Sequence, residues 1–420
     1  MNVLIIGSGG REHAFAWKLS QSPLLDKLFI SPGNAGTEAY GENLSIDPLD
    51  FDALKQAVAK NGIELVIVGP EVPLVQGLKD ELSSSLPDVH VIGPGSSGAQ
   101  LEGSKAYAKE FMGRHGIPTA AYREFSSGQL KAAHTYIRAQ SLPIVLKADG
   151  LAAGKGVIIC NSHDEAIKEI GEMLSGKFGS ASAKVVIEEF LNGIEFSVFA
   201  VTDGRSYQLL PIAKDYKRIG EGDTGLNTGG MGSISPVPFV DKQLMQKVEE
   251  RIVQPTIQGI SNEGLDYRGF LFFGLIEVNG DPYVIEYNCR MGDPETQSVL
   301  PRIQTDMMEI CLAVARGKVK NLKITFDSRT VASVVMVSGG YPGPYEKGKE
   351  IMGINGVRDS LVFYAGVKKE GQKLLTSGGR VLAVTSFGSD MSQAIQTSYL
   401  QIQQISFDGA YYREDIGFDL

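Results

Sequence analysis

The segment VIEYNCRMGDPETQ (residues 284–297) carries the clearest chemical pattern in this chain of 420 residues. Because alternate side chains of a β-strand share one face, Glu286 and Asn288 are predicted to point together, with Arg290 beside them if the strand continues. Carboxylate and amide oxygens are ligands that Mg²⁺ takes alongside phosphate oxygens. Such polar groups would be costly in a plain core. The alternative is an edge strand whose polar face is solvated. The segment therefore predicts a metal and phosphate site.

The glycine-rich segment GLAAGKG (150–156) lies between two runs of strand formers. It misses the P-loop pattern, because three rather than four residues separate its first two glycines and a glycine replaces the hydroxyl residue. The flanking strand formers predict a hairpin loop that covers phosphates, with Lys155 supplying positive charge to the transferred group. A plain surface hairpin is the alternative, and Lys147 disfavours it by lying just upstream in an otherwise apolar strand.

The segment VVIEEFLNGIEF (185–196) places carboxylates at the end of one predicted strand and the start of the next. Glu188 and Glu195 suit a linker that presents backbone groups to an adenine edge and a carboxylate to ribose hydroxyls. Solvated charges on a strand edge explain the same residues almost as well, so both interpretations stay open.

The segment AKDYKRIGEGDTGLNTGGMGS (213–233) sets Asp215, Lys217 and Arg218 before a long glycine-rich loop. Loops of this length without regular structure are commonly functional. Basic residues followed by glycine-rich backbone suit a substrate that carries carboxylate, amine and phosphate groups. A flexible lid with incidental charge is the alternative.

The N-terminal loop GSGGREH (7–13) follows a predicted strand and opens a predicted helix, so its backbone N–H groups are placed to receive an anion. It is a poor dinucleotide fingerprint, because Glu12 occupies the position of the third glycine and the next strand lacks the expected acidic residue. A phosphate or ribose contact, a tight turn and an NAD site are the three interpretations, with NAD the least favoured.

The elements around these segments follow from hydrophobic patterning. Residues 1–100 alternate short apolar runs with helix-like stretches, which predicts a parallel sheet covered on both faces, with ligands at the carboxyl ends of its strands. Residues 143–212 are strand-rich, a long helix is predicted at about 241–262, and Asn279-Gly280 predicts a hairpin turn. The remainder of the chain is again strand-rich.

These patterns predict a mixed α/β and α+β chain of three units, residues 1–102, 103–325 and 326–420. Composition limits their function: 43% of residues are hydrophobic, 21% are charged, and the net charge is −9. Nucleic acids and anionic membranes need broad positive fields, so neither is expected as a partner. The three cysteines and five histidines show no spacing typical of a metal site, and no apolar run reaches about 18 residues. A reducing, cytoplasmic location is expected.

Six strings occur in one order along the chain: GSGGREHA, GPEVPLVQGL, KADGLAAGKGV, IEEFLNGIEFS, NTGGMG and EYNCRMGDPETQ. With them the chain resembles the ATP-grasp superfamily and, within it, the phosphoribosylamine–glycine ligase family, essentially from end to end. The resemblance implies a Rossmann-like three-layer N-terminal domain, an ATP-grasp core with a mobile lid at about 120–192, and a strand-rich C-terminal domain. It also implies ATP-dependent ligation of glycine to 5-phosphoribosylamine through a glycyl phosphate, in purine biosynthesis.

The resemblance also assigns roles to matching positions. The implied ATP contacts are Lys105, Lys147, Gly150, Gly154, Lys155, Gly156, Glu188, Glu189, Phe190, Leu191 and Glu195. The implied ligands of Mg²⁺ or Mn²⁺ are Glu286 and Asn288, with Glu277 on the partner strand as a third candidate. The implied substrate contacts are Gly9, Gly10, Arg11, Glu12, Glu71, Asp215, Lys217, Arg218, Asn227, Thr228, Gly229, Gly230 and Arg290. The candidate catalytic residues are Arg290, Asp215 and Lys155, and the backbone N–H groups of 227–232 are expected to face a tetrahedral intermediate.

The chain departs from the family pattern at four positions. Lys214 and Tyr216 stand where the family commonly has Gln and His, Leu226 stands in place of Pro, and Met291 stands in place of Phe. The charged residues beside them are retained, so the site is expected to be intact. A role for that histidine does not transfer to this chain.

Three rival functions remain open at this stage. The first is another ATP-grasp carboxylate–amine ligase or a carboxylase, which would keep the ATP residues and change the substrate region. The others are an NAD-dependent dehydrogenase and a catalytically inactive nucleotide-binding regulator. The expected partners are small-molecule substrates, and the expected assembly is a monomer or a small homo-oligomer.

Overall fold

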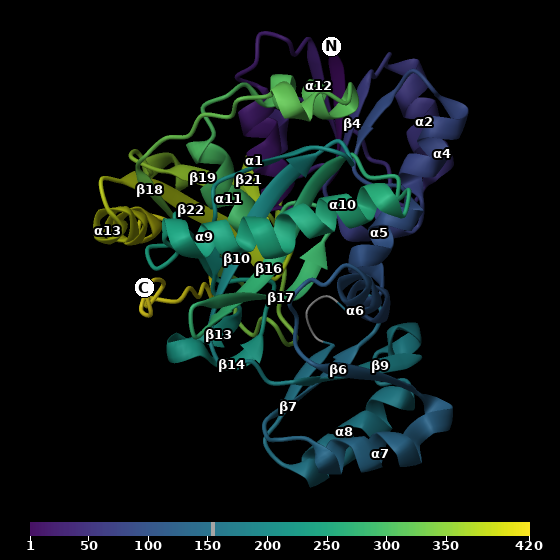
Figure 1. Cartoon of the computed structure of the whole chain (residues 1–420). Helices are drawn as coiled ribbons and strands as arrows, with labels where there is room; N and C mark the ends of the chain where they lie inside the picture. Colours follow the sequence, from purple (N-terminus) through teal and green to yellow (C-terminus); the bar gives the residue numbers. More distant parts are fainter. Residues whose placement is uncertain (153–155) are drawn as a thin grey trace.

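The N-terminal part of the chain forms a five-stranded parallel sheet. A computed structural model describes residues 1–152 and 156–420 (Figure 1). The sheet has the order β3-β2-β1-β4-β5. Its strands are β1 (Asn2–Gly7), β2 (Lys27–Pro32), β3 (Glu42–Asn43), β4 (Leu65–Val68) and β5 (His90–Ile92). Its main helices are α1 (Gly10–Leu19), α2 (Phe51–Lys60), α4 (Leu78–Ser85) and α5 (Ser96–Gly103).

Both faces of this sheet are buried, which explains its continuous apolar strands. In β1, Val3 and Ile5 join one hydrophobic cluster, whereas Leu4 and Ile6 join another on the opposite face. Alternate residues of a strand point to opposite faces, so a strand covered on both sides must be apolar throughout. The predicted three-layer arrangement is confirmed.

A four-stranded antiparallel sheet of order β11-β10-β16-β17 lies at the centre of the molecule. Its strands are β10 (Ile194–Thr202), β11 (Tyr207–Leu209), β16 (Gly269–Val278) and β17 (Asp281–Asn288). Asn279 and Gly280 join β16 to β17 with φ of 52° and 81°, so the predicted hairpin turn is confirmed. The helix expected near 241–262 is α9 (Lys242–Val248) and α10 (Gln254–Asn262), joined by a π turn at Glu249–Val253.

The lid forms a separate lobe at the bottom of Figure 1. Its antiparallel sheet has the order β6-β9-β7-β8. The strands are β6 (Tyr122–Ser126), β7 (Ile144–Ala148), β8 (Val157–Cys160) and β9 (Lys184–Glu189), and the helices are α7 (Leu130–Ala139) and α8 (His163–Leu174). β7 pairs with β8 from Ile144–Cys160 to Lys147–Val157, so the glycine-rich segment connects the strands of a hairpin as predicted. Gly154 and Lys155 themselves lie outside the described residues.

The C-terminal sheet has the order β12-β15-β18-β22-β19. β18 (Thr330–Val337), β19 (Leu361–Tyr364) and β22 (Arg380–Gly388) come from the end of the chain, whereas β12 (Lys214–Asp215) and β15 (Gly232–Ser235) come from its middle. Patterning gave no sign that these two short strands would cross over. The helix α13 (Met391–Ile402) was also not predicted, although Ala394, Ser398 and Ile402 are buried at a spacing of four residues.

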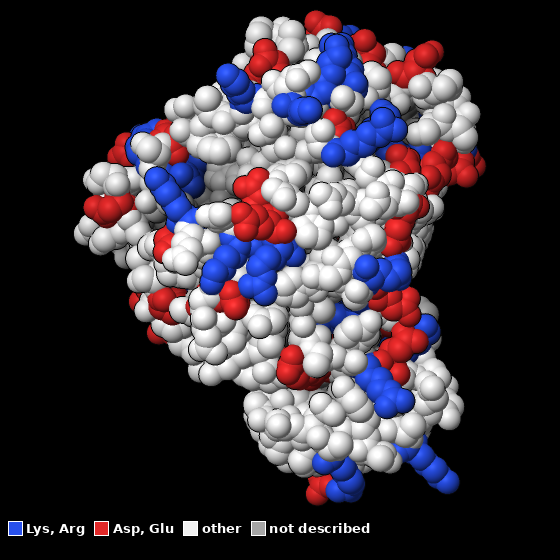
Figure 2. Space-filling model, viewed as in Figure 1, with Lys and Arg blue, Asp and Glu red and all other residues white. Residues whose placement is uncertain are grey.

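Charges of both signs are mixed over the face drawn in Figure 2, and the lid lobe stands out below the body. Within residues 1–152 and 156–420, no helix combines the length and apolar character that a membrane crossing requires.

Candidate active site

Glu286 and Asn288 project from the face of β17 that is turned away from the helical core. Between them Tyr287 is buried in that core, where its hydroxyl lies 2.9 Å from Thr256 Oγ1. An extra residue at Ile285 bulges the strand just before Glu286. In the part of the chain that the structure describes, no side chain pairs with either Glu286 or Asn288. The sequence therefore placed these two oxygen donors on one face, and their ligand capacity is not used by the described side chains.

Two lysines bring the lid and α6 (Lys105–Arg114) against the same region. Lys105 Nζ donates to Gly150 O at 3.3 Å, and Lys147 Nζ donates to Ile285 O at 3.3 Å, next to Glu286. Burial lowers the pKa of Lys105, and the Glu286 carboxylate is the largest charge acting against that shift. Lys105, Lys147, Glu188, Glu286 and Asn288 are called the lid-side cluster below.

Asp149 fixes the base of the glycine-rich loop to the start of α6. Its Oδ1 accepts hydrogen bonds from Ser104 Oγ at 2.9 Å and from Ala106 N at 2.8 Å. Ser104 is also the N-cap of α6, accepting from Tyr107 N. Ala148 N donates to Gly156 O, which closes the loop.

Glu188 is buried between the lid and α6 and does not lie on an open strand edge. Only 4% of its side chain is exposed, and its Oε2 lies 2.9 Å from Lys147 Nζ and 3.0 Å from Lys109 Nζ. Burial would raise the pKa of Glu188, but the two lysines hold it below the ordinary value. Among the described residues, Oε1 of Glu188 is buried without a hydrogen-bond partner.

The residues after Glu188 turn outward. Glu189 accepts a hydrogen bond from Ala121 N at 2.7 Å, and Phe190 is 38% exposed at the start of the linker to β10 that contains Leu191. Glu277, the third metal candidate, lies near the end of β16, and its carboxylate accepts a hydrogen bond from Gly280 N in the hairpin turn. That contact occupies Glu277 in the turn and disfavours it as a metal ligand.

A second cluster forms around β12. Lys217 Nζ lies 2.6 Å from Glu195 Oε2 and 4.0 Å from Asp215 Oδ1. Arg218 points elsewhere, since its guanidinium donates to Gly225 O inside the hairpin of β13 (Arg218–Gly220) and β14 (Thr224–Asn227). The structure thus brings Asp215 and Lys217 together with Glu195, and separates the side chain of Arg218 from them.

Glu295 joins this cluster from the helix α11 (Glu295–Val299). Its Oε1 accepts from Ser197 Oγ at 3.4 Å. Burial, together with the Asp215 carboxylate, raises the pKa of Glu295 to about 8, and burial also raises the pKa of Asp215. Two neighbouring buried carboxyl groups resist double ionisation. Asp215, Lys217, Glu195, Glu295 and Arg290 are called the β12-side cluster below.

Arg290 continues the 284–297 segment into a buried ion-pair network. Its Nη2 lies 2.6 Å from Glu102 Oε1, and its Nε lies 3.4 Å from Glu71 Oε2 without hydrogen-bond geometry. Glu102 also accepts from Cys289 N at 2.7 Å. Burial would lower the pKa of Arg290, but the two glutamates raise it, so this guanidinium is held charged.

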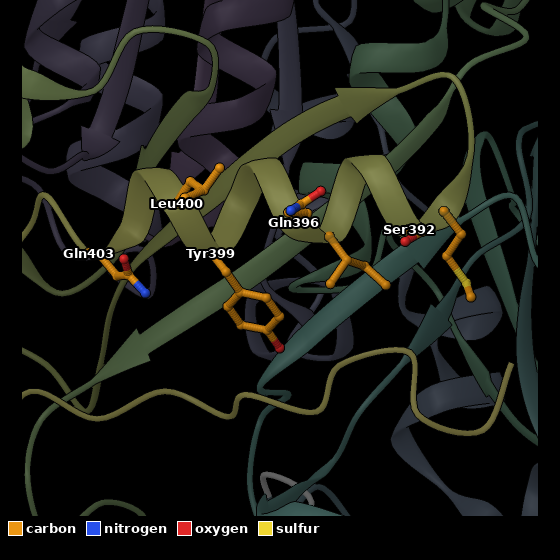
Figure 3. A pocket seen from close by; sticks show the side chains of 7 residues that line it. Ser392, Gln396, Tyr399, Leu400 and Gln403 are labelled. Atoms are coloured by element: carbon orange, nitrogen blue, oxygen red, sulfur yellow. The ribbon is translucent and has the colours of Figure 1, made fainter.

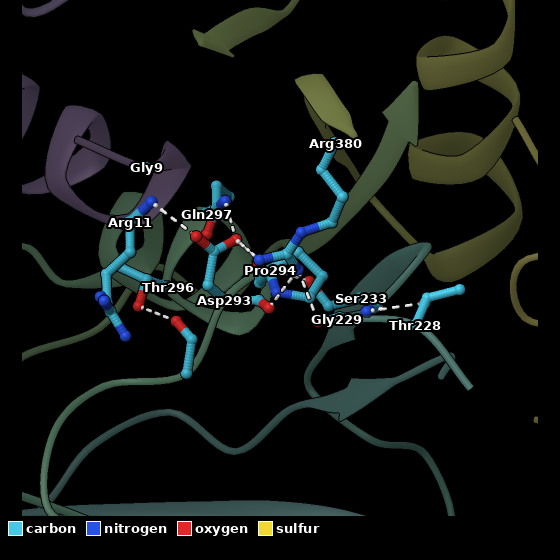
Figure 4. Close-up of polar contacts among 12 residues, drawn as sticks. Gly9, Arg11, Thr228, Gly229, Ser233, Asp293, Pro294, Thr296, Gln297 and Arg380 are labelled. Atoms are coloured by element: carbon cyan, nitrogen blue, oxygen red, sulfur yellow. Dashed lines mark hydrogen bonds and ion pairs between the residues drawn. The ribbon is translucent and has the colours of Figure 1, made fainter. Parts of the chain in front are cut away.

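The N-terminal loop meets the same segment (Figure 4). Glu12 caps α1 by accepting from Gly9 N at 2.6 Å, and it also accepts from Arg11 Nε at 2.6 Å. Arg11 N in turn donates to Asp293 Oδ2 at 3.3 Å, and Arg11 Nη1 donates to Met291 O at 3.1 Å. Gly10 packs against Gln297 so closely that an added Cβ would lie 2.4 Å from Nε2. The glutamate that breaks the dinucleotide pattern therefore serves as a helix cap.

The glycine-rich segment of residues 227–232, which joins β14 to β15, is already hydrogen-bonded within the protein. The N–H groups of four residues donate to protein acceptors: Thr228 to Lys217 O, Gly229 to the Tyr341 hydroxyl, Gly230 to Thr228 Oγ1, and Met231 to Tyr216 O. Asn227 pairs with Arg218 in the hairpin. In this conformation these four donors already have protein acceptors, and the expected role of residues 227–232 at a tetrahedral intermediate stays a prediction.

The sequence reasoning missed five residues at this site: Lys109, Glu102, Asp293, Glu295 and Arg380. Asp293 and Glu295 lie inside the quoted 284–297 segment, so that segment carried a signal beyond its first half. Arg380 bridges Asp293 and Gly229 O from the distant strand β22 (Figure 4), and no local pattern marks it.

A surface hollow of about 550 Å³ lies along α13, lined by Met391, Ser392, Ile395, Gln396, Tyr399, Leu400 and Gln403 (Figure 3). Its lining residues come from this one helix and from Gln403, which directly follows it. It shares no residue with either cluster, and it is open to solvent.

The fold and the two clusters define an ATP-grasp protein, in which a lid sheet and a core sheet meet over buried lysines and an oxygen-donor pair. Family models agree in order along the chain: the phosphoribosylglycinamide synthetase N domain matches residues 1–102, the ATP-grasp (A) domain 103–296, and the C domain 331–419. The chain belongs to the phosphoribosylglycinamide synthetase family.

Individual relatives agree with that assignment. Phosphoribosylamine–glycine ligases of Pasteurella multocida and Haemophilus influenzae are each 47% identical, over 100% of this chain and 98% of theirs. The crystal structure of the Thermotoga maritima phosphoribosylamine–glycine ligase matches with a TM-score of 0.85 at 36% identity, covering 99% of this chain and 100% of that one. A biotin carboxylase domain from Hydrogenobacter thermophilus, solved with MgADP, ADP and bicarbonate, matches with a TM-score of 0.73 over 98% of this chain and 91% of its own. Its 16% identity shows the fold alone.

Proposed function

We propose that this chain joins glycine to 5-phosphoribosylamine at the expense of ATP, giving glycinamide ribonucleotide, ADP and phosphate in purine biosynthesis. Full-length similarity to phosphoribosylamine–glycine ligases supports the substrates. The structural observation that carries the proposal is the lid-side cluster. In it Glu286 lies near the half-buried Lys105 and next to the carbonyl that the buried Lys147 contacts, and neither Glu286 nor Asn288 has a described side-chain partner.

The first step is transfer of a phosphoryl group. A glycine carboxylate oxygen attacks the γ-phosphorus of ATP, the bond to the β–γ bridging oxygen breaks, and ADP leaves with that electron pair. The protein contributes mainly position and positive charge, because the transition state spreads negative charge over oxygens. Lys105 and Lys147 supply that charge from opposite sides of the lid boundary, and the lid excludes water that would hydrolyse glycyl phosphate. Gly154 and Lys155 lie outside the described residues, and their phosphate contacts stay a prediction.

Glu286 and Asn288 fit a divalent cation, because hard oxygen donors on one strand face are the ligands that Mg²⁺ uses beside phosphates. Such a cation neutralises phosphate charge during transfer. We propose Mg²⁺ or Mn²⁺ for this position.

The second step is attack of the phosphoribosylamine nitrogen on the acyl carbon. The new C–N bond forms, the bond to the phosphate oxygen breaks, and the nitrogen loses a proton. Asp215 is a suitable acceptor for that proton, because burial raises its pKa. The ammonium group of Lys217 lies beside it. Arg290 and Arg11 offer positive charge to the acyl phosphate and the substrate phosphate. Gly9, Gly10, Glu12, Glu71, Arg218 and residues 227–230 remain proposed substrate contacts.

We also propose three units at 1–102, 103–325 and 326–420, with the lid at about 120–192, and a cytoplasmic location. The sheet of the C-terminal unit then includes β12 and β15, which belong to the middle unit in sequence.

A coupled assay of ADP release tests the proposed function. Purified protein with Mg²⁺ and ATP should release ADP only when glycine and phosphoribosylamine are both present, with each omitted in turn as the control. ADP release that depends on a different acid and amine would identify the chain as a carboxylate–amine ligase with other substrates. Tight ATP binding without such release would indicate a regulator.

A further inference from the structure

Lys109 is a buried cation that no motif in the sequence marked. It lies on α6, outside the lid, with 2% of its side chain exposed. Its Nζ lies 3.0 Å from Glu188 Oε2 on the lid strand β9 and donates to Thr119 Oγ1 at 2.7 Å. The ring of Tyr122 lies 5.6 Å from the same Nζ. The ion pair therefore crosses the boundary between lid and core at the point where the lid begins.

The two lysines on Glu188 extend to neighbouring carbonyls of β17. Thr119 Oγ1, which accepts from Lys109, donates to Val284 O at 2.7 Å. Lys147 Nζ donates to Ile285 O at 3.3 Å. Both chains of contacts thus end on the two residues that precede Glu286. Glu188 is tied through them to the backbone that holds the proposed metal ligands.

The two carboxylate oxygens of Glu188 differ in their contacts. Oε2 receives both ammonium groups, whereas Oε1 is buried without a partner among the described residues. A buried carboxylate oxygen lacking a donor is costly, so a ligand that supplies an N–H group there gains affinity. The exocyclic amine of adenine supplies one. Guanine presents a carbonyl oxygen at the corresponding ring position, and two acceptors repel.

We infer that Lys109 is a positioning residue that orients Glu188 for an amino-bearing purine and thereby sets the selectivity for ATP over GTP. The inference rests on the proposed function for the identity of the nucleotide site. Lys109 acts through Glu188 and does not itself contact the base. Without it, one ammonium holds the carboxylate, the link to Thr119 is lost, and Oε1 is no longer directed at one position.

The variant Lys109→Met keeps most of the length of the side chain and removes its charge. Hydrogen bonds to charged groups contribute about 1.5–3 kcal/mol, which corresponds to about 10- to 150-fold in affinity. We expect KM for ATP and Kd for MgADP to rise in that range, and the ATP-to-GTP ratio of kcat/KM to fall by a similar factor. The kcat at saturating ATP should stay close to that of the unmodified protein. Lys184→Met is the matched control, because Lys184 lies on the same strand as Glu188, is half exposed and pairs with Glu124 instead.

The unmodified protein offers a second test that needs no variant to fold. Burial lowers the pKa of Lys109 to about 8. The Glu188 and Glu189 carboxylates act to raise this pKa, and the Lys147 ammonium acts to lower it. KM for ATP should therefore rise as the pH passes upward through about 8, and this rise should be absent in Lys109→Met.

The outcomes separate this inference from the proposed function. If Lys109→Met retains the KM, Kd and nucleotide selectivity of the unmodified protein while glycine-dependent ADP release continues, the inference is overturned and the proposed function stands. If the unmodified protein shows no glycine-dependent ADP release, the proposed function fails. In that case the role of Lys109 is still decided by comparing the affinities of the unmodified protein and of Lys109→Met for MgADP and MgGDP.

Discussion

The lid-side and β12-side clusters are both rich in charged side chains, yet they differ in how many of their polar groups have partners within the protein. In the lid-side cluster, Glu188 Oε1 has no partner and Glu286 and Asn288 have no side-chain partners among the described residues. In the β12-side cluster, Lys217 pairs with Glu195 and Arg290 Nη2 pairs with Glu102, although Arg290 Nε has no hydrogen-bond partner among the described residues. The nearby N–H groups of residues 228–231 also have protein acceptors.

This difference indicates where a ligand supplies missing contacts and where it must replace existing ones. Buried polar groups are normally hydrogen-bonded, so unsatisfied ones within a described site are informative. Under the proposed function, the lid-side cluster is preorganised for a nucleotide and a cation. Most charged side chains of the β12-side cluster already have partners in the protein, and we expect these ion pairs to rearrange when substrate binds.

Loss of the carboxylate at position 286 should have the largest effect on the rate. Glu286→Ala removes an oxygen donor that no described side chain uses, so the fold should persist while glycine-dependent ADP release falls about 10³-fold or more. The matched control is Glu277→Gln on the partner strand, whose carboxylate serves the hairpin turn. Comparable losses in both variants would contradict the assignment of Glu286.

Removal of the guanidinium of Arg290 should have the largest effect on stability. Arg290→Met leaves Glu102 buried with an uncompensated charge, and breaking one partner of such a pair costs about 3–5 kcal/mol. Chemical denaturation followed by circular dichroism measures the loss. Because Gln is neutral, the double variant Arg290→Met/Glu102→Gln should recover part of it, and an equal or larger loss in the double variant would count against the pair.

Glu295 should give the unfolding free energy a measurable pH dependence. Its ordinary pKa of 4.5 is raised to about 8 in the folded protein by burial and by Asp215. The folded state therefore keeps a proton that the unfolded state releases, so Glu295 favours folding below pH 4.5 and this contribution is lost as the pH rises to about 8. The slope is at most about 1.4 kcal/mol per pH unit. Glu295→Gln should show a shallower fall over pH 5–8, and an unchanged slope would refute the shift.

The smallest effect on stability is expected from Lys217→Met. Lys217 and Glu195 are about 40% and 44% exposed, and ion pairs of that kind contribute about 1 kcal/mol or less. The same change should raise KM for a substrate, because the ammonium lies beside Asp215. Thermal unfolding together with steady-state kinetics distinguishes the two effects. A large stability loss with unchanged KM would make Lys217 a structural residue only.

Local sequence patterns predicted much of the lid-side cluster and far less of the β12-side cluster. Period-two alternation was enough to put Glu286 and Asn288 on one face, and Asn279-Gly280 was enough to predict the hairpin that carries them. Both signals lie within a few residues of sequence. Lys109 carried no such signal, because its partner Glu188 is 79 positions away and the pair forms only when the lid sheet docks on α6.

The β12 side depends on contacts between distant segments. β12 and β15 join a sheet whose other strands begin at Thr330, and two-residue strands such as β12 are too short to show a period. The backbone donors of residues 228–231 looked available because a glycine-rich loop was assumed to be open. Their acceptors come partly from Tyr341, more than a hundred residues later.

The most direct test of the central claim is a crystal structure of this chain with MgADP. We expect the cation at about 2.1 Å from carboxylate and amide oxygens of Glu286 and Asn288, with the adenine amine at Glu188 Oε1 and Lys109 still on Oε2. A nucleotide bound elsewhere, with Glu286 and Asn288 contacting only protein or solvent, would contradict the account.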